Sequence, residues 1–245
     1  MKSPHGVVYE AYRPTVMGLR GMVVAGHPLA AQAGMIALQK GGNAVDAAVA
    51  TATALNVVEP NMSGVGGDGF IMIFDRASGE VQIVNATGAA PFGATREVYK
   101  DGLPMKGIRS VSVPGLVDGW LQAHARYGRL GLDTAFAPAI TLAAEGFPVS
   151  YKLAEYMAAE PGLVSYPSSR AIFAPTGRHL RAGEILRQKD LARTLEKIAA
   201  GGAEAFYRGE IAQALVRFSE ENGGLLTMRD FAEHHTRWHQ PIYVD

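Results

Sequence analysis

The sequence predicts an α+β fold, in which a small sheet is joined to a larger set of helices. Two apolar runs separated by a turn, 70–74 and 81–84, indicate a β-hairpin. Beyond Pro91 the chain shows mainly helical patterns, each ending at or near glycine or proline. No long linker, low-complexity tract or internal repeat is visible, so residues 1–245 are expected to form a single structural unit.

The predicted elements begin with residues 22–25, a short run rich in β-branched residues that suits a core strand. A helix should follow from Pro28, because proline lacks an N–H that the first helical turn would leave unpaired. The glycines at 41 and 42 end that helix, and Asn43 can cap a second one over residues 44–58. The small side chains of this second helix predict close packing against a neighbouring element.

A hairpin is predicted to follow these two helices. The glycine-rich turn 63–69 enters residues 70–74, a continuous apolar run typical of a strand covered on both faces. Residues 75–79 supply turn chemistry, and residues 81–84 return as the partner strand.

The rest of the chain is expected to be mostly helical. Helical spacing of apolar residues appears at 116–127, 132–145, 151–157, 188–200 and 204–222. Residues 241–245 resemble a strand that is only beginning. The predicted strands are too few to form a sheet that so many helices could cover. We therefore expect another segment to supply further strands.

The composition excludes several classes of function. The chain has 23 basic and 23 acidic residues, so no net field attracts nucleic acid or an anionic membrane. It contains no cysteine, which excludes disulfides, thiolate metal sites and cysteine nucleophiles within these residues. Residues 1–18 show no signal-peptide pattern, and the apolar-leaning run 44–58 is too short to span a bilayer. We therefore expect a cytoplasmic protein that binds neither nucleic acid nor membrane.

The residues from Gly64 to Gly69 match the G-x-G-x-x-G spelling of a dinucleotide-binding loop. Such a loop leaves a strand and opens a helix, whereas this one leaves a predicted helix and enters a predicted strand. No acidic residue stands about twenty positions on, where the chain has Asn85, Ala86 and Thr87. We interpret the glycines as a tight turn that needs left-handed backbone angles and close packing, and we expect no cofactor.

Histidines gather near the C-terminus and raise the question of a metal. His235 and His239 would share one face of a helix, but a nearby tryptophan and proline favour an extended segment equally. Apart from Glu233 or Asp230, no carboxylate is obviously placed as a third ligand. These histidines and His234 are therefore interpreted as a solvated surface, and no metal is expected.

Motifs for a nucleophile are missing from the sequence. No serine lies in a G-x-S-x-G elbow, and no Ser-x-x-Lys pair appears in a convincing setting. A Ser/His/Asp triad stays open, because such groups converge in space and not in sequence order. His27 lies between a predicted strand and a predicted helix, so it is expected to form hydrogen bonds at that turn and not to catalyse. Trp120, Tyr151 and Tyr156 are interpreted as core or rim residues.

Several short motifs, in this order, resemble the opening of the gamma-glutamyltranspeptidase family of N-terminal-nucleophile hydrolases. They are VAGHPLA at 24–30, GGNAVDAAVA at 41–50, VEP at 58–60 and GGDGF at 66–70. Further matches follow, among them AFYRG at 205–209 and GGLL at 223–226. The combination is highly specific, and it covers about residues 18–245.

This resemblance implies a four-layer αββα sandwich, of which the present residues form the large-chain part. Members of the family cut one precursor into a large N-terminal and a small C-terminal chain. The new N-terminal Thr of the small chain is the nucleophile, and its freed α-amine is the base. The resemblance therefore implies that no catalytic residue lies in this chain, that the small chain is its partner, and that an acyl-enzyme passes its acyl group to water or an amine.

The resemblance also implies where substrate binds. In family members an arginine shortly before an Ala-Pro pair grips the α-carboxylate of the γ-glutamyl group. Counting back from Pro91, that position holds Thr87, whose hydroxyl cannot replace a bidentate guanidinium. Its loss costs on the order of 2–5 kcal/mol of binding if nothing compensates. Thr87 and its neighbours Asn85 and Gly88 are the candidate substrate-binding residues.

We therefore expect an amidohydrolase or acyltransferase that acts on a small amide other than a γ-glutamyl compound, as the oxamate amidohydrolase and cephalosporin acylase branches of the family do. Two alternatives stay open. Arg96 or Arg109 could replace the missing arginine, which would leave a true glutathione hydrolase or γ-glutamyltransferase. The fold could also serve as a catalytically inactive binding or scaffold protein.

Overall fold

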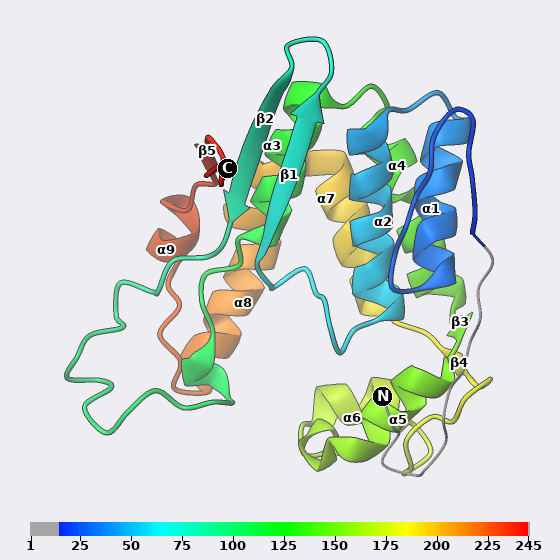
Figure 1. The fold of residues 1–245 in the computed structure, drawn as a ribbon. Coiled ribbons are helices and arrows are strands. Elements are labelled where there is room, and N and C mark those ends of the chain that lie inside the picture. Colours follow the sequence, from blue (N-terminus) through cyan, green and yellow to red (C-terminus); the bar gives the residue numbers. More distant parts are fainter. Residues whose placement is uncertain (1–14, 245) are drawn as a thin grey trace.

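The structure is a computed structural model that describes residues 15–244 (Figure 1). Helices form one body, and a small sheet lies along one side of it (Figure 1). This arrangement confirms the predicted α+β class.

The elements, with η for 3-10 helices, are α1 (Pro28–Gln39), α2 (Ala44–Val58), β1 (Gly69–Asp75), β2 (Glu80–Ala86), η1 (Ile108–Ser110), α3 (Leu116–Tyr127), α4 (Leu132–Glu145), β3 (Phe147–Pro148), α5 (Tyr151–Ala159), η2 (Pro161–Val164), α6 (Pro167–Phe173), β4 (Ile185–Leu186), α7 (Lys189–Tyr207), α8 (Glu210–Glu221), α9 (Met228–Ala232) and β5 (Arg237–His239).

Local signals place the first helices and the hairpin where they were predicted. Asn43 caps α2 through its Oδ1, which accepts hydrogen bonds from the backbone N–H groups of Val45 and Asp46 at 2.9 and 3.1 Å. The Asp46 carboxylate accepts in return from the Asn43 N–H at 2.7 Å, which completes a capping box. Helices α3 and α4 also have their predicted bounds. These segments were predicted well because capping and periodicity lie in neighbouring residues.

Two predicted strands are wrong. Residues 22–25 have no regular structure, because no described strand lies beside them to pair with, and Val24 is exposed. Residues 241–244 are likewise irregular. The strand of this region, β5, lies a few residues earlier, where it pairs with β2. A strand needs a hydrogen-bonding neighbour, and the apolar pattern alone does not supply one.

The helix predicted over 204–222 is also wrong in its bounds. Residues up to Tyr207 belong to α7, which is kinked at Gly202, where φ is 57°. Arg208 and Gly209 then separate α7 from α8. The predicted boundary near residue 201 is therefore a kink, and the true break comes later.

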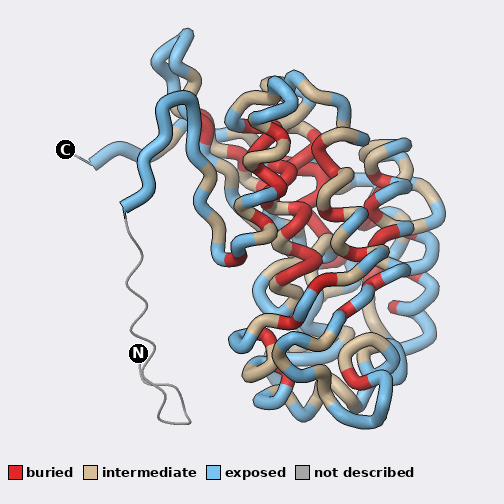
Figure 2. Tube along the Cα trace, turned by 90° about the vertical axis from the view of Figure 1, so that its right-hand side faces the viewer, coloured by how far each residue is buried: buried red, intermediate tan, exposed pale blue. Residues whose placement is uncertain are grey.

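The hydrophobic core lies between the helices, and Figure 2 shows that the buried residues concentrate there. Its largest fully buried side chains come from four helices and from β3, and they are Trp120 (α3), Phe136 (α4), Phe147 (β3), Phe206 (α7) and Phe231 (α9). Helices α1 and α2 approach closely, since a Cβ on Gly34 would lie 2.2 Å from Oγ1 of Thr51. The close packing predicted from the small residues of α2 is confirmed. Among residues 15–244, no helix combines the length and the apolar character needed to cross a membrane.

The sheet has the antiparallel order β1-β2-β5, and its two faces differ. One face packs on α3, where Val84 and Ala86 are completely buried. The other face, which we call the open face, carries Phe70, Met72 and Phe74, with exposed fractions of 68%, 72% and 64%. Within the described residues, the prediction that 70–74 is covered on both faces is therefore wrong.

Candidate substrate-binding site

The end of β2 and the loop after it carry the three residues predicted to bind substrate. The backbone N–H and the hydroxyl of Thr87 both donate hydrogen bonds to Oδ1 of Asn85, at 3.1 and 2.6 Å. The backbone N–H of Gly88 donates to Oδ1 of Asp68 at 2.6 Å. The hydroxyl proton of Thr87 is thus used in a hydrogen bond to Asn85.

Gly88 lies where a second loop approaches closely. A Cβ at this position would lie 1.5 Å from the carbonyl oxygen of Val113. The two loops are also joined by a hydrogen bond from the Val113 N–H to the Ala89 carbonyl at 3.0 Å. Only glycine fits at residue 88, and this packing fixes the position of Thr87 beside it.

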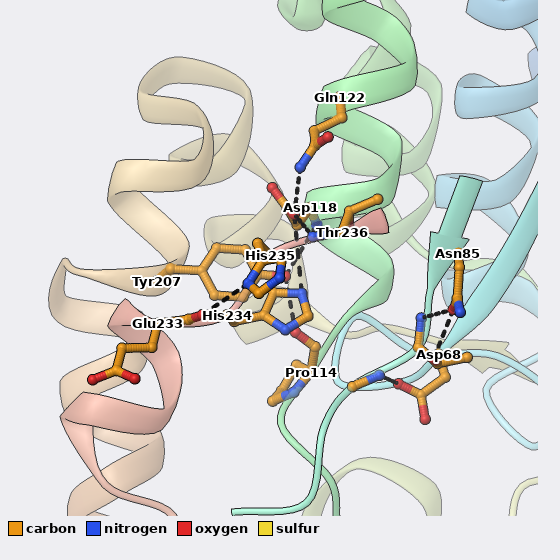
Figure 3. Close-up of polar contacts among 12 residues, drawn as sticks. Asp68, Asn85, Pro114, Asp118, Gln122, Tyr207, Glu233, His234, His235 and Thr236 are labelled. Carbon is orange, nitrogen blue, oxygen red and sulfur yellow. Dashed lines mark hydrogen bonds and ion pairs between the residues drawn. The ribbon is translucent and has the colours of Figure 1, made fainter. Parts of the chain in front are cut away.

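These residues form one wall of a pocket of about 230 Å³. The segment after α9 forms the opposite wall, and Figure 3 shows Asn85 and Asp68 on one side and His234 on the other. The volume lies below the roughly 300–1,000 Å³ of pockets for drug-sized ligands, so it suits one small polar group with a short chain. The residues around it are Asn85, Thr87, Gly88, Ala89, Glu233, His234, His235 and Arg237.

A buried polar network holds the second wall in place (Figure 3). The Tyr207 hydroxyl donates to the Pro114 carbonyl at 2.8 Å and accepts from the Asp118 N–H at 3.0 Å. Oδ2 of Asp118 accepts from the Thr236 N–H and from Nε2 of Gln122, both at 2.7 Å. Burial raises the pKa of Tyr207, so its phenol keeps the proton that it donates. The network joins α3, α7 and the segment before β5.

His234 belongs to this buried network, and the prediction of a solvated surface is wrong for it. Its side chain is 3% exposed and stacks on Tyr207, with ring centroids 5.2 Å apart. Its Nε2 lies 4.0 Å from Oδ2 of Asp118 and has no hydrogen-bond partner. Burial lowers the pKa of His234, and the charge of Asp118 opposes that shift only in part. The ring is therefore mainly neutral at pH 7.

His235, His239 and His27 lie as the sequence predicted. His235 and His239 are exposed, and His239 lies in β5 and not on a helix. His27 is the N-cap of α1, where its Nδ1 accepts from the Leu29 N–H at 3.2 Å, so its hydrogen-bonding role at the turn is confirmed. Across residues 15–244, no three potential ligands are grouped to hold a metal ion.

The glycine-rich loop leaves α2 and enters β1, which confirms that it lacks the strand-to-helix order of a dinucleotide-binding loop. The predicted reason for its glycines is wrong for Gly64 and Gly66. Neither has a left-handed φ, and a Cβ on either would meet no atom within 4 Å. Both residues instead border a second pocket, of about 350 Å³, which also contains Asp68. Their small size leaves backbone open to contact from outside.

The arginine beside the candidate site is not one of those that the sequence suggested. Neither Arg96 nor Arg109 lines the pocket, and Nε of Arg109 donates to the Gly223 carbonyl at 3.1 Å. Arg237 does line it. Sequence reasoning missed Arg237 because it lies some 150 positions beyond Asn85, and only the pairing of β2 with β5 brings the two together.

The profile of the gamma-glutamyltranspeptidase family matches residues 30–245. The chain belongs to this family. It is 37% identical, over 246 residues, to the glutathione hydrolase proenzyme of Bacillus subtilis (strain 168), which covers 97% of this chain and 42% of that protein. It is 41% identical, over 235 residues, to the glutathione hydrolase-like YwrD proenzyme of the same strain, covering 94% and 45%. The crystal structure of cephalosporin acylase from Bacillus halodurans superposes with a TM-score of 0.92 at 40% identity, covering 100% and 48%.

This gamma-glutamyltranspeptidase-family chain thus spans less than half the length of these relatives. Its fold is that of the N-terminal-nucleophile hydrolases and combines helices with a sheet. The relatives are named for glutathione and for a cephalosporin, so membership of the family does not by itself fix a substrate.

Proposed function

We propose that this chain is the large chain of a self-processing amidohydrolase or acyltransferase that acts on a small amide other than a γ-glutamyl compound. The nucleophile is the N-terminal Thr of a small chain cut from the same precursor. Its hydroxyl attacks the amide carbonyl while the freed α-amine takes the proton, so that an acyl-enzyme forms and the amine product leaves. Backbone donors stabilise the oxyanion, and water or an amine then takes the acyl group.

The observation that carries this proposal is the open face of the sheet. Phe70, Met72 and Phe74 are each more than 60% exposed and stand in a row on one strand. Contiguous apolar surface of this kind marks a site of contact with another chain. A second sheet, carried by the small chain, would bury these side chains and complete the sandwich.

The open loop of Gly64 and Gly66 supports the same arrangement. It stands at the start of β1, at the edge of the open face, and Asp68 links it to Gly88 in the candidate pocket. Glycine lets another backbone approach without a side chain in the way. A segment of the small chain that reaches this loop would lie beside the pocket. The nucleophile must lie there in order to reach a bound substrate.

The substrate part of the proposal depends on Thr87. A γ-glutamyl α-carboxylate would meet a hydroxyl there, and that hydroxyl already donates to Asn85 at 2.6 Å. Its remaining capacity is as an acceptor, which repels a carboxylate. The position is therefore unsuited to the recognition that the resemblance implies for γ-glutamyl substrates.

Intact-mass analysis of the full-length gene product tests the processing step. We expect two fragments, with Thr at the start of the second, and one unprocessed chain when that Thr is replaced by Ala. A wild-type protein that stays in one piece and hydrolyses no amide would instead support an inactive scaffold.

A substrate panel tests the specificity. We expect kcat/KM for oxamate or a short acyl p-nitroanilide to exceed that for γ-glutamyl-p-nitroanilide and glutathione by about tenfold or more. A factor of this size corresponds to the binding free energy of one charge-assisted hydrogen bond. A preference for the γ-glutamyl compounds would contradict the substrate assignment while leaving the chemistry intact.

A further inference from the structure

Asp68 carries a negative charge that no cation neutralises within residues 15–244. Its Oδ1 accepts from the Gly88 N–H at 2.6 Å, and its Oδ2 accepts from the Ser112 hydroxyl at 3.2 Å. Both donors are neutral, and in that range Asp68 takes part in no ion pair. A neutral acceptor, such as the amide oxygen of asparagine, would serve the same donors. The two contacts therefore do not account for the charge.

The groups around Asp68 supply no counter-charge. Burial raises the pKa of Tyr207, and the charges of Asp118 and Asp68 add to that shift, so two carboxylates act on one phenol. Burial lowers the pKa of His234, which leaves its ring mainly neutral at pH 7. Arg237 lines the candidate pocket but forms no ion pair with Asp68. A cation for Asp68 must come from outside the described residues.

Asp68 lies between the two pockets. It borders the pocket of about 350 Å³ together with Gly64 and Gly66, and its bond to Gly88 reaches the wall of the candidate pocket. Figure 3 shows it on the same side of the site as Asn85. The residue is exposed, so a group that enters along the glycine-rich loop can contact its carboxylate.

The other carboxylates beside the candidate pocket are already occupied. Oε1 of Glu233 accepts from Nε of Arg229 at 2.7 Å. Asp118 is 9% exposed and accepts from Thr236 and Gln122. An ammonium group that arrives at this place would therefore pair with Asp68.

We propose that Asp68 is a positioning residue that holds the α-amino group of the N-terminal Thr of the small chain. The inference rests on the proposed function and gives the described chain a part in its chemistry. The Thr Oγ forms a bond to the amide carbon while its proton passes to the α-amine, which becomes an ammonium. That ammonium then gives the proton to the leaving nitrogen as the C–N bond breaks. Asp68 orients the base and stabilises its protonated form without taking the proton, as the carboxylate of a catalytic triad does.

This role predicts a specific pH dependence. A neighbouring carboxylate favours the charged form of an amine, so it raises the pKa of the α-amine above its ordinary value of about 8. The amine must be neutral to accept the proton. Removal of the charge in Asp68→Asn should therefore move the acidic limb of the kcat/KM profile to lower pH by about one pH unit. The plateau value of kcat should fall by about tenfold, because the ammonium formed in the attack loses its counter-charge.

The pH profiles are measured on the full-length, processed protein with an amide that wild type hydrolyses. Asp68→Asn removes the charge alone, since the amide can accept from Gly88 and donate to the Ser112 hydroxyl. Asp68→Glu keeps the charge and should restore part of both effects. Asp101→Asn, at an exposed position in the loop between β2 and η1, is the matched control and should leave the profile unchanged. All variants should be processed, because the α-amine does not exist before the cut.

Carbamylation by cyanate gives a readout that does not depend on turnover. Cyanate reacts with the neutral amine, so the rate at which the first peptide of the small chain gains mass reports the protonation of its α-amine. We expect the midpoint of this rate against pH to fall by about one pH unit in Asp68→Asn and to stay constant in Asp101→Asn. The N-terminal peptide of the large chain serves as the internal reference.

Four results would overturn the assignment. An unchanged limb with an unchanged cyanate profile in Asp68→Asn contradicts it and leaves the proposed chemistry intact. A limb that moves while the cyanate profile stays constant places the cation on the substrate instead. Loss of processing in Asp68→Asn shows that Asp68 serves the folding of the precursor. A wild-type protein that stays in one chain contradicts the proposed function, and this inference with it.

Discussion

The two faces of the β1–β2–β5 sheet are made by the same strands, yet in the described residues only one of them is covered by a helix. On the covered face α3 approaches so closely that a Cβ on Gly119 would lie 2.3 Å from the Cβ of Ala86. On the open face Phe70, Met72 and Phe74 have no layer over them in the described chain. Within the described residues, the helices bury their apolar side chains against one another, whereas the sheet leaves one apolar face exposed.

Polar groups follow the same division. On the covered face Nε1 of Trp238 donates to Oε1 of Gln122 at 2.9 Å, and Gln122 donates to Asp118. On the open face Asn85 and Arg237 keep donors free. Satisfied polar groups fix a structure, and unsatisfied ones at a pocket are available to a ligand. The polar side chains with free donors therefore lie on the face of the sheet that the described residues leave exposed.

Removal of the largest core side chain beneath the covered face should have the largest effect. Trp120 of α3 is 2% exposed and meets Phe136 edge to face at 6.4 Å. We expect Trp120→Ala to lower the free energy of unfolding by about 3–5 kcal/mol, measured by urea denaturation. Tyr151→Ala, at an exposed position on α5, should change it little. Equal effects would show that the core does not lie where we place it.

A truncation on the open face tests whether another layer covers it. In the full-length processed protein, Met72→Ala should cost about 2–5 kcal/mol, because a covered methionine leaves a cavity when truncated. Met105→Ala is the control, since Met105 is 94% exposed in a loop. If thermal or urea unfolding shows no difference between the two variants, the open face stays uncovered in the mature protein.

A smaller effect is expected at Gly88, in the loop after β2. Because its Cβ would lie 1.5 Å from the Val113 carbonyl oxygen, Gly88→Ala should destabilise the protein by about 1–3 kcal/mol and lower kcat/KM by displacing Thr87. Gly93→Ala is the matched control, since the nearest atom to its Cβ is 3.7 Å away. Wild-type kinetics in Gly88→Ala would show that the loop adapts without loss.

The smallest effect is a pH dependence from buried histidines. Burial lowers the pKa of both His27 and His234 below 6.5, so the folded state holds these rings neutral. Below pH 6.5 the unfolded chain binds more protons, and the free energy of unfolding should therefore fall as the pH is lowered. His234→Gln should weaken this fall, and His239→Gln, at an exposed position in β5, should not. Urea titrations on both sides of that pH measure it, and parallel curves for wild type and His234→Gln would contradict it.

The sequence by itself determined the elements whose signals are local. These signals are the capping box of Asn43 and Asp46, the helical spacing of α1 to α4 and the hairpin turn. Each lies within a short stretch of the chain, so the interactions that favour the element are present in that stretch alone. The short motifs also identified the family and, through it, placed Asn85, Thr87 and Gly88 in one candidate site.

The tertiary structure alone decided which distant residues meet. Arg237 faces Asn85 because β5 pairs with β2, and the buried ring of His234 stacks on Tyr207 from α7. The run 22–25 has strand-like residues and forms no strand, because no described neighbour completes its hydrogen bonds. Pairing across a sheet and burial against another helix depend on the whole fold, and the pattern of a short segment does not contain them.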